Sequence, residues 1–197
     1  MIQLAAGAYC WSAFNAEKKF NFNGHILRSS AGTVIVDPVP FAPDDLSVIE
    51  AAGLKPDALL ITNRNHIRSR DAVLAKWPGL PTVVHEAEAA QIDFKADRLV
   101  KDGETVHGVV AVHLPGKSPG EIGLYWPERR LFLLGDALIA PNGKLKTVPA
   151  EKQDDPALLR KSLETLRTYD FDHLLVGDGD PLLGDAKSAV VGWLKAP

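Results

Sequence analysis

Residues 113–138 read "HLPGKSPGEIGLYWPERRLFLLGDAL", the segment of the chain with the clearest pattern of strands and turns. Its two apolar runs, 122–126 and 131–134, are joined by the turn sequence Pro-Glu-Arg-Arg, which is typical of antiparallel strands in a hairpin. A loop rich in Pro and Gly that carries Lys117 precedes the hairpin, and Gly-Asp at 135–136 follows it. The stretch therefore predicts a β-region with polar residues at the ends of its strands.

The rest of the chain alternates between strand and helix patterns. In chain order, we expect a β-meander over 1–40, a helix over 42–52, a strand over 57–61, a helix over 69–76, a strand over 81–86, a short helix over 86–92, strands and turns over 97–140, a helix over 155–169, a strand over 172–176 and a helix over 184–195. The apolar face of the 155–169 helix is formed by Leu158, Leu159, Leu163 and Leu166.

This order of elements predicts an α/β (α+β) fold, a four-layer αβ/βα sandwich in which two mixed β-sheets pack face to face with helices outside. No internal repeat, low-complexity tract or linker interrupts the order. We therefore expect a single domain over 1–197.

Composition narrows the range of partners. The chain has 197 residues, 46% of them hydrophobic, and a net charge of -3 with both signs interspersed, which argues against nucleic acid and anionic membranes as partners. Its apolar runs are shorter than the roughly 20 residues that a membrane span needs. Cys10 is the only cysteine, so no internal disulfide or CxxC site can form. We expect a cytoplasmic protein, and the sequence leaves its oligomeric state open.

Four segments in order carry a resemblance to a known family: "VDP" at 36–38, "ITNRNHIR" at 61–68, the stretch 113–138 and "LLVGDGDPL" at 174–182. Together they resemble the metallo-β-lactamase fold superfamily. The third segment is the most specific, because it is similar to the family pattern Pro-Gly-His-Thr-Pro-Gly-Ser, a hairpin and Gly-Asp. The resemblance implies the same sandwich fold and a hydrolase-like ancestry.

The resemblance also implies where metal ligands would stand, and most of them are substituted here. Members usually hold one or two zinc or iron ions with His-x-His-x-Asp-His and later His and Asp residues. The family's histidines are replaced by Asn63, Asn65, Arg68, Lys117 and Asp178, and its motif aspartate is replaced by Ile67. Asp136 matches the metal-bridging aspartate and is retained. Asp37 resembles a strand-end aspartate that orients the motif loop.

These substitutions change charge as well as donor type. Zinc needs donors with a lone pair, and an ammonium or a guanidinium offers none. Asp136 and Asp178 would face each other in one pocket and require counter-charge, which Lys117 and Arg68, with Arg64, could supply. The hypothesis is that a salt-bridge network has replaced the metal cluster. A simpler interpretation of Asp136, as a residue that caps a helix or holds a loop, stays open.

The histidines give weaker signals. His66 falls at the variable position of the motif, so we expect it to face solvent or to be satisfied in the core rather than to bind a metal. The other five show no ligand spacing and are expected to be structural: His25, His85, His107, His113 and His173.

Two functions are therefore carried forward, and the sequence alone does not decide whether the protein is an enzyme. The first is a metal-free relative of the hydrolases, a pseudoenzyme-like binding protein or an enzyme of altered chemistry, with no cofactor expected and a small anionic molecule as the expected partner. The alternative is a metal-dependent hydrolase with a mononuclear site for zinc or another divalent transition metal, built from His66, Asp136 and Asp178. A third, weaker interpretation makes Lys117 a nucleophile or proton carrier.

The pocket predicted from these arguments comprises Asp37, Asn63, Arg64, Asn65, His66, Arg68, Lys117, Asp136 and Asp178. Its candidate catalytic residues are His66, Lys117, Asp136 and Asp178.

Overall fold

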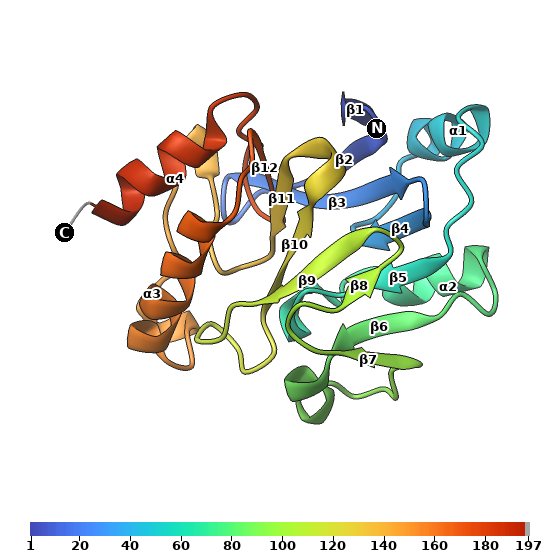
Figure 1. Cartoon of the computed structure of the whole chain (residues 1–197). Helices are drawn as coiled ribbons and strands as arrows, with labels where there is room; N and C mark the ends of the chain where they lie inside the picture. The colour runs from blue at the N-terminus through green and yellow to red at the C-terminus, as the bar shows by residue number, and fades with distance from the viewer. Residues whose placement is uncertain (196–197) are drawn as a thin grey trace.

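The computed structural model describes residues 1–195, and the first of its two sheets is built by the N-terminal half of the chain (Figure 1). The strands lie in sequence order: β1 (Ile2–Ala5), β2 (Ala8–Asn15), β3 (Phe20–Ser29), β4 (Gly32–Val36), β5 (Ala58–Leu60), β6 (Thr82–His85) and β7 (Arg98–Val100). The pairs from β1 to β4 are antiparallel, whereas β4 to β7 are parallel. The sheet is therefore mixed, and its parallel strands all end at the same edge.

The second sheet is centred on the hairpin predicted from residues 113–138. Its order is β12-β11-β10-β9-β8, with β8 (Thr105–Val106), β9 (Val109–His113), β10 (Ile122–Trp126), β11 (Leu131–Leu134) and β12 (His173–Val176). The hairpin strands β10 and β11 pair antiparallel, with Leu124 opposite Leu133, and β12 pairs parallel to β11. This sheet is mixed as well.

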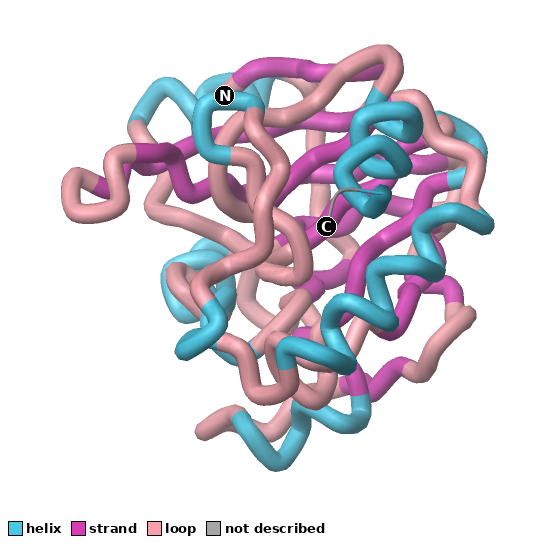
Figure 2. Tube along the Cα trace, turned by 90° about the vertical axis from the view of Figure 1, so that its left-hand side faces the viewer, coloured by secondary structure: helices cyan, strands magenta, loops and turns pink. Residues whose placement is uncertain are grey.

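Helices cover the two outer faces. In Figure 1, α1 (Pro43–Ala51) and α2 (Arg70–Lys76) lie on the right and α3 (Pro156–Leu163) and α4 (Ala186–Lys195) on the left, with the sheets between them. Figure 2, turned by 90°, shows helical segments in front of the strands, as four layers require.

Alternation along the strands explains the layering. Val34 and Val36 belong to the core between the sheets, whereas Ile35 packs in the cluster that includes Ile49 of α1. Leu131 and Leu133 likewise face the central core, and Phe132 and Leu134 pack with α3 and α4. Because both faces of these strands are buried, the strands appear in the sequence as continuous apolar runs.

The predicted fold class is confirmed, with three local differences. The helix expected over 155–169 ends as an α-helix at Leu163 and continues as a 3₁₀ segment, Glu164–Thr168. Leu158, expected on the apolar face of this helix, is 39% exposed. Successive residues of a helix are about 100° apart, which places Leu158 at the side of the face that buries Leu159 and Leu163. The strand β7 joins the first sheet by pairing with β6, although the sequence placed it with the second β-region.

That residues 1–197 form a single domain stays a prediction. Among the described helices, none is both long enough and apolar enough to cross a bilayer.

Candidate functional site

Five polar positions separated along the chain meet at one edge of the sandwich. Asp37 follows β4, the loop 62–68 follows β5, and Asp136 and Asp178 follow the parallel strands β11 and β12. Lys117 lies in the loop between β9 and β10. The carboxyl ends of parallel strands open toward the same edge, which is why residues so far apart in sequence come together. The convergence expected from the sequence is what the structure shows.

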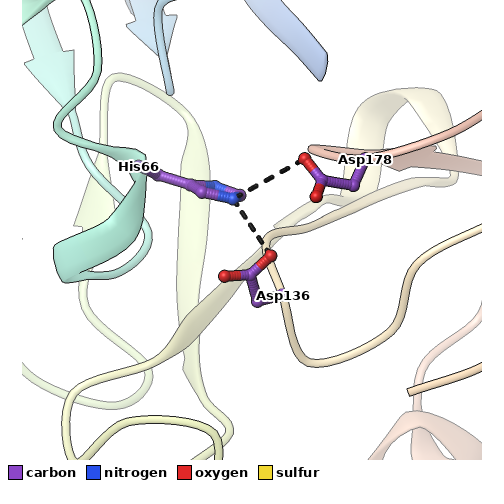
Figure 3. Close-up of side chains that lie close together, drawn as sticks. All are labelled: His66, Asp136 and Asp178. Carbon is purple, nitrogen blue, oxygen red and sulfur yellow. Dashed lines mark hydrogen bonds and ion pairs between the residues drawn. The ribbon is translucent and has the colours of Figure 1, made fainter. Parts of the chain in front are cut away.

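His66 lies at the centre of this cluster (Figure 3). It is 1% exposed, and its Nδ1 lies 2.7 Å from Asp37 Oδ2. Its Nε2 points to the other side, 3.2 Å from Asp136 Oδ1 and 4.0 Å from Asp178 Oδ1. Exposure of His66 to solvent is therefore excluded, whereas the other expectation, a ring satisfied by buried partners, agrees with these contacts. A role for His66 as a metal ligand stays a prediction.

The local turn explains why His66 points inward. Asn63 Oδ1 accepts a hydrogen bond from the backbone N–H of Asn65 at 2.9 Å, which caps a single 3₁₀ turn over Arg64–His66. The turn directs the His66 side chain back toward the end of β5. Gly177 is required opposite it, because a Cβ there would lie 2.4 Å from the His66 ring.

Asp37 holds the start of the same loop. Its fully buried carboxylate accepts hydrogen bonds from the backbone N–H of Thr62 at 2.8 Å and from the Thr62 hydroxyl at 2.6 Å. A buried carboxylate with several donors is a stable arrangement, because each hydrogen bond offsets part of the cost of removing the charge from water. Asp37 therefore fixes both the strand end and the ring of His66.

Lys117 is enclosed by oxygen atoms. Its ammonium lies 2.8 Å from Asp136 Oδ2 and donates a hydrogen bond to Asn63 Oδ1 at 3.1 Å and another to Asn65 Oδ1. The side chain is 3% exposed. An ammonium has three donors, and here each has an acceptor.

Arg68 forms an ion pair with Asp178. Its Nη2 lies 2.5 Å from Asp178 Oδ1, and its guanidinium stacks 4.7 Å from the centre of the Phe22 ring. The buried Asn23 holds the turn that carries Asp178, because its side-chain amide donates to the carbonyl oxygens of Val176 and Gly179. The pair is therefore fixed from both sides.

Glu121 was not predicted from the sequence. Its Oε1 accepts the backbone N–H groups of Asp136 at 2.8 Å and Ala137 at 3.1 Å, while its Oε2 is buried without a hydrogen-bond partner among the described residues. It stands where the family pattern has a serine, and that substitution is the one signal that could have drawn attention to it. Glu121 positions the backbone of Asp136 rather than its carboxylate.

Burial and neighbouring charge shift several pKa values at this edge. Burial and the charge of Arg68 oppose protonation of His66, but Asp136 and Asp37 outweigh them and raise its pKa to about 10. Burial also opposes ionisation of Asp136, yet His66 and Lys117 hold the pKa of that carboxyl far below its usual range.

Two other carboxyl groups at this edge are shifted the other way. Burial raises the pKa of Asp178, and burial together with Asp136 raises the pKa of Glu121 to about 8. The cations of His66, Arg68 and Lys117 contact three aspartates: Asp37, Asp136 and Asp178.

Arg64 does not join this cluster, although it was expected to share in neutralising Asp136 and Asp178. Its guanidinium reaches Asp154 at 2.6 Å and Gln91 at 3.1 Å instead. Side chains two residues apart in a 3₁₀ turn point in different directions, so Arg64 reaches Asp154 while His66 reaches Asp136. The simpler interpretation of Asp136 as a loop-holding residue does not describe its carboxylate, which contacts Lys117 and His66.

Three side chains of the cluster could together hold a metal ion. The three possible ligand atoms, one each on His66, Asp136 and Asp178, lie within 4.8 Å of one another. Two carboxylates and one imidazole are enough for a mononuclear transition-metal site. The neighbours do not match in charge, because Lys117 and Arg68 lie against the carboxylates that the ion would need. The residues present fit a metal in donor number and type but not in the charge around them.

Fold and site together define an αβ/βα sandwich protein of the hydrolase-like class, with its polar cluster at the strand ends of one edge. The family model of the metallo-beta-lactamase superfamily matches residues 4–192, so this chain belongs to that superfamily.

Known proteins agree with this assignment. The hydroxyacylglutathione hydrolase of Brucella anthropi is 30% identical over 131 residues, which cover 58% of this chain and 50% of that protein, so the chain spans about half the length of this curated relative. The metallo-beta-lactamase from Pontibacter korlensis superimposes with a TM-score of 0.78 at 14% identity, covering 98% of this chain and 95% of that chain. TTHA1623, solved in a di-iron-bound form, superimposes with a TM-score of 0.72 at 20% identity, covering 92% of this chain and 96% of that chain. At such identities the structural likeness shows the fold alone.

Proposed function

We propose that this superfamily member has a degenerate metal centre, in which side-chain cations take the role of metal ions, and that it acts as a non-metal binding protein or as an enzyme of altered chemistry. The observation that carries the proposal is the environment of Lys117. Its ammonium meets Asn63 Oδ1, Asn65 Oδ1 and Asp136 Oδ2, a set of oxygens that surrounds it as ligands surround an ion. Two of these acceptors stand at positions where the family has metal-binding histidines.

The second half of the cluster supports the same proposal. Arg68 and the protonated His66 supply positive charge to Asp178 and Asp136, the two carboxylates that would otherwise repel each other. A divalent ion placed among these donors would add charge to a site whose carboxylates already contact cations. Binding would require Lys117 or Arg68 to move, which exposes an unpaired buried charge.

One observation favours the alternative, a metal-dependent hydrolase. The donors of His66, Asp136 and Asp178 lie close enough to share one ion. An ion there would act by activating a water molecule. The chain's own residues would then hold the ion, while Asp37 would keep the His66 ring in position.

Metal content of the purified protein separates the two proposals. We expect the wild type to contain no stoichiometric transition metal by mass spectrometry of the acid-digested protein. The triple variant Asn63→His, Asn65→His, Lys117→His should bind zinc measurably, because it removes the ammonium and restores three imidazoles. A control variant, Lys117→Met alone, removes the charge without adding donors and should bind less zinc than the triple variant. Tight zinc binding by the wild type that is lost in Asp136→Ala would favour the hydrolase.

Other expectations from the sequence stay predictions. These are the cytoplasmic location, the absence of nucleic acid and membrane partners, and a small anionic molecule as ligand. An anion would have to compete with Asp136 and Asp178 for Lys117 and Arg68, which already contact those carboxylates.

A further inference from the structure

A buried carboxylate outside the cluster connects the two loops that form it. Glu88 lies on the 3₁₀ helix Glu86–Gln91 and is 1% exposed. Its Oε1 accepts the backbone N–H of Arg64 at 2.6 Å, and its Oε2 accepts the backbone N–H of Gly120 at 2.7 Å. A buried carboxylate is costly unless it is hydrogen-bonded, and charge-assisted bonds of this length are among the strong ones. Glu88 is therefore tied to both loops at once.

The two amides belong to the segments that enclose the Lys117 ammonium. Arg64 stands between Asn63 and Asn65, whose side-chain oxygens accept from Lys117. Gly120 is in the loop that carries Lys117, three residues further along the chain. A movement of either amide relative to Glu88 would change the distance between the ammonium and its acceptors.

The backbone of the Glu88 helix also touches the Lys117 loop directly. A Cβ built on Gly120 would lie 2.4 Å from the backbone nitrogen of Glu88 and 2.5 Å from its Cβ, so the absence of a side chain at Gly120 is required by this approach. The contact is close enough that the helix sets the position of the loop.

A histidine pair reinforces the same connection. His113 Nε2 lies 2.8 Å from the carbonyl oxygen of Pro119, in the Lys117 loop, and the His113 ring stacks on His85 with 4.0 Å between ring centres. His85 Nδ1 in turn accepts the backbone N–H of Ala87, at the start of the Glu88 helix. Loop and helix are thus joined through two independent sets of contacts.

We propose that Glu88 is a positioning residue, which sets the distance between the Lys117 ammonium and the side-chain oxygens of Asn63 and Asn65 by holding the amides of Arg64 and Gly120. The role rests on the proposed function in one respect, that Lys117 is taken as the cation at the centre of the cluster. Glu88 touches no group that would react, and it acts through the backbone of the two loops.

The experiment is amide hydrogen exchange and ¹⁵N NMR on the full chain in the Glu88→Gln variant. A glutamine keeps the shape but offers one acceptor, so one or both of the Arg64 and Gly120 amides should exchange at least about tenfold faster. The Lys117 side-chain ammonium signal should shift or broaden. The amide of Leu133, in the hydrogen-bonded hairpin, serves as the reference for global stability, and its rate should change less.

Two further variants keep the test decisive. Gly120→Ala keeps the glutamate at position 88 but pushes its backbone away from the Lys117 loop, and it should produce the same change in the Lys117 signal. Glu86→Gln, on the same helix, removes an exposed charge and should leave both amides and the Lys117 signal unchanged.

Several outcomes would overturn the assignment. Unchanged exchange at Arg64 and Gly120 in Glu88→Gln would show that the two bonds do not hold the loops. Equal acceleration at Leu133 would mean that Glu88 serves the fold as a whole, and an unchanged Lys117 signal in both Glu88→Gln and Gly120→Ala would mean that the loops do not set its environment. Stoichiometric metal in the wild type would refute the proposed function without altering these exchange results, so the two failures are distinguishable.

Discussion

Two ion-pair networks of similar geometry lie in very different surroundings. In the cluster at the sandwich edge, Lys117 Nζ lies 2.8 Å from Asp136 Oδ2, and the side chains are 3% and 9% exposed. Just before β11, Arg130 Nε lies 2.7 Å from Asp172 Oδ2, and those side chains are 47% and 50% exposed. The distances are nearly equal. Burial therefore decides what each pair contributes.

The difference follows from what happens when one partner is removed. Around Arg130, water replaces the missing charge and screens the one that remains. In the cluster, the remaining charge stays in a site from which water is largely excluded, so it is left without compensation. The buried network is thus fragile toward single changes, although its net contribution relative to apolar residues can be small.

The largest expected effect comes from breaking the buried pair. Lys117→Met should lower the free energy of unfolding by about 3–5 kcal/mol, because Asp136 is then left buried without its ammonium. The double variant Lys117→Met, Asp136→Asn should recover part of that loss, since the stranded carboxylate is gone. Urea unfolding followed by circular dichroism measures both, and Lys144→Met, at an exposed position, is the matched control. A Lys117→Met protein as stable as this control would show that the cluster is wet.

Some features of the fold and of the buried cluster were predictable from the sequence, and others were not. Strands with continuous apolar runs and clear turns were predictable, because the length of a run and the turn residues that flank it are local properties of the sequence. The meeting of Asp136 and Asp178 was predictable from the family pattern and from their place after strands. The sequence left the direction of the His66 side chain open, because that direction depends on the single 3₁₀ turn capped by Asn63.

Glu88 and Glu121 were missed for a different reason. Each lies in an ordinary-looking segment, and its role arises from backbone amides of residues more than ten positions away. Side chain–to–backbone contacts of that kind leave no spacing signature in a single sequence. The one local hint was the glutamate at 121 in place of the family's serine.

Unlike the buried ion pairs, His25 is a buried polar side chain whose ring nitrogens have no hydrogen-bond partner among the described residues. Burial lowers the pKa of His25 to about 4. Unfolded His25 takes up a proton below about pH 6.5 while the folded form stays neutral, so this residue lowers stability as pH falls from about 6.5 to about 4. The difference amounts to about 3 kcal/mol.

The variant His25→Leu should lack that part of the pH dependence. Free energies of unfolding at several pH values between 4 and 7 measure it, relative to wild type. His107→Asn is the control, because His107 has the positive φ of 46° that Asn tolerates and is not buried. If wild type and His25→Leu lose stability in parallel on acidification, His25 is already protonated in the folded protein.

A smaller effect is expected from an anionic ligand at the buried cluster. Phosphate at about ten times its dissociation constant should stabilise the protein by about 1.4 kcal/mol if it binds at Lys117 or Arg68. The increase in melting temperature should weaken in Lys117→Met, because one of the three cations that contact the two aspartates is then lost. An equal increase in both proteins would place the anion elsewhere on the surface.

The smallest effect is expected at the exposed network. Arg130→Met removes a guanidinium that contacts Asp170 and Asp172, yet all three side chains are well exposed and water can take its place. We expect the urea midpoint to shift by less than that of any buried variant, and the shift should disappear in about 1 M salt, where the screening length falls to about 3 Å. The same salt should leave the Lys117→Met effect nearly unchanged, because ions reach a buried pair poorly. A loss in Arg130→Met as large as in Lys117→Met would mean that geometry, and not burial, sets the strength of these pairs.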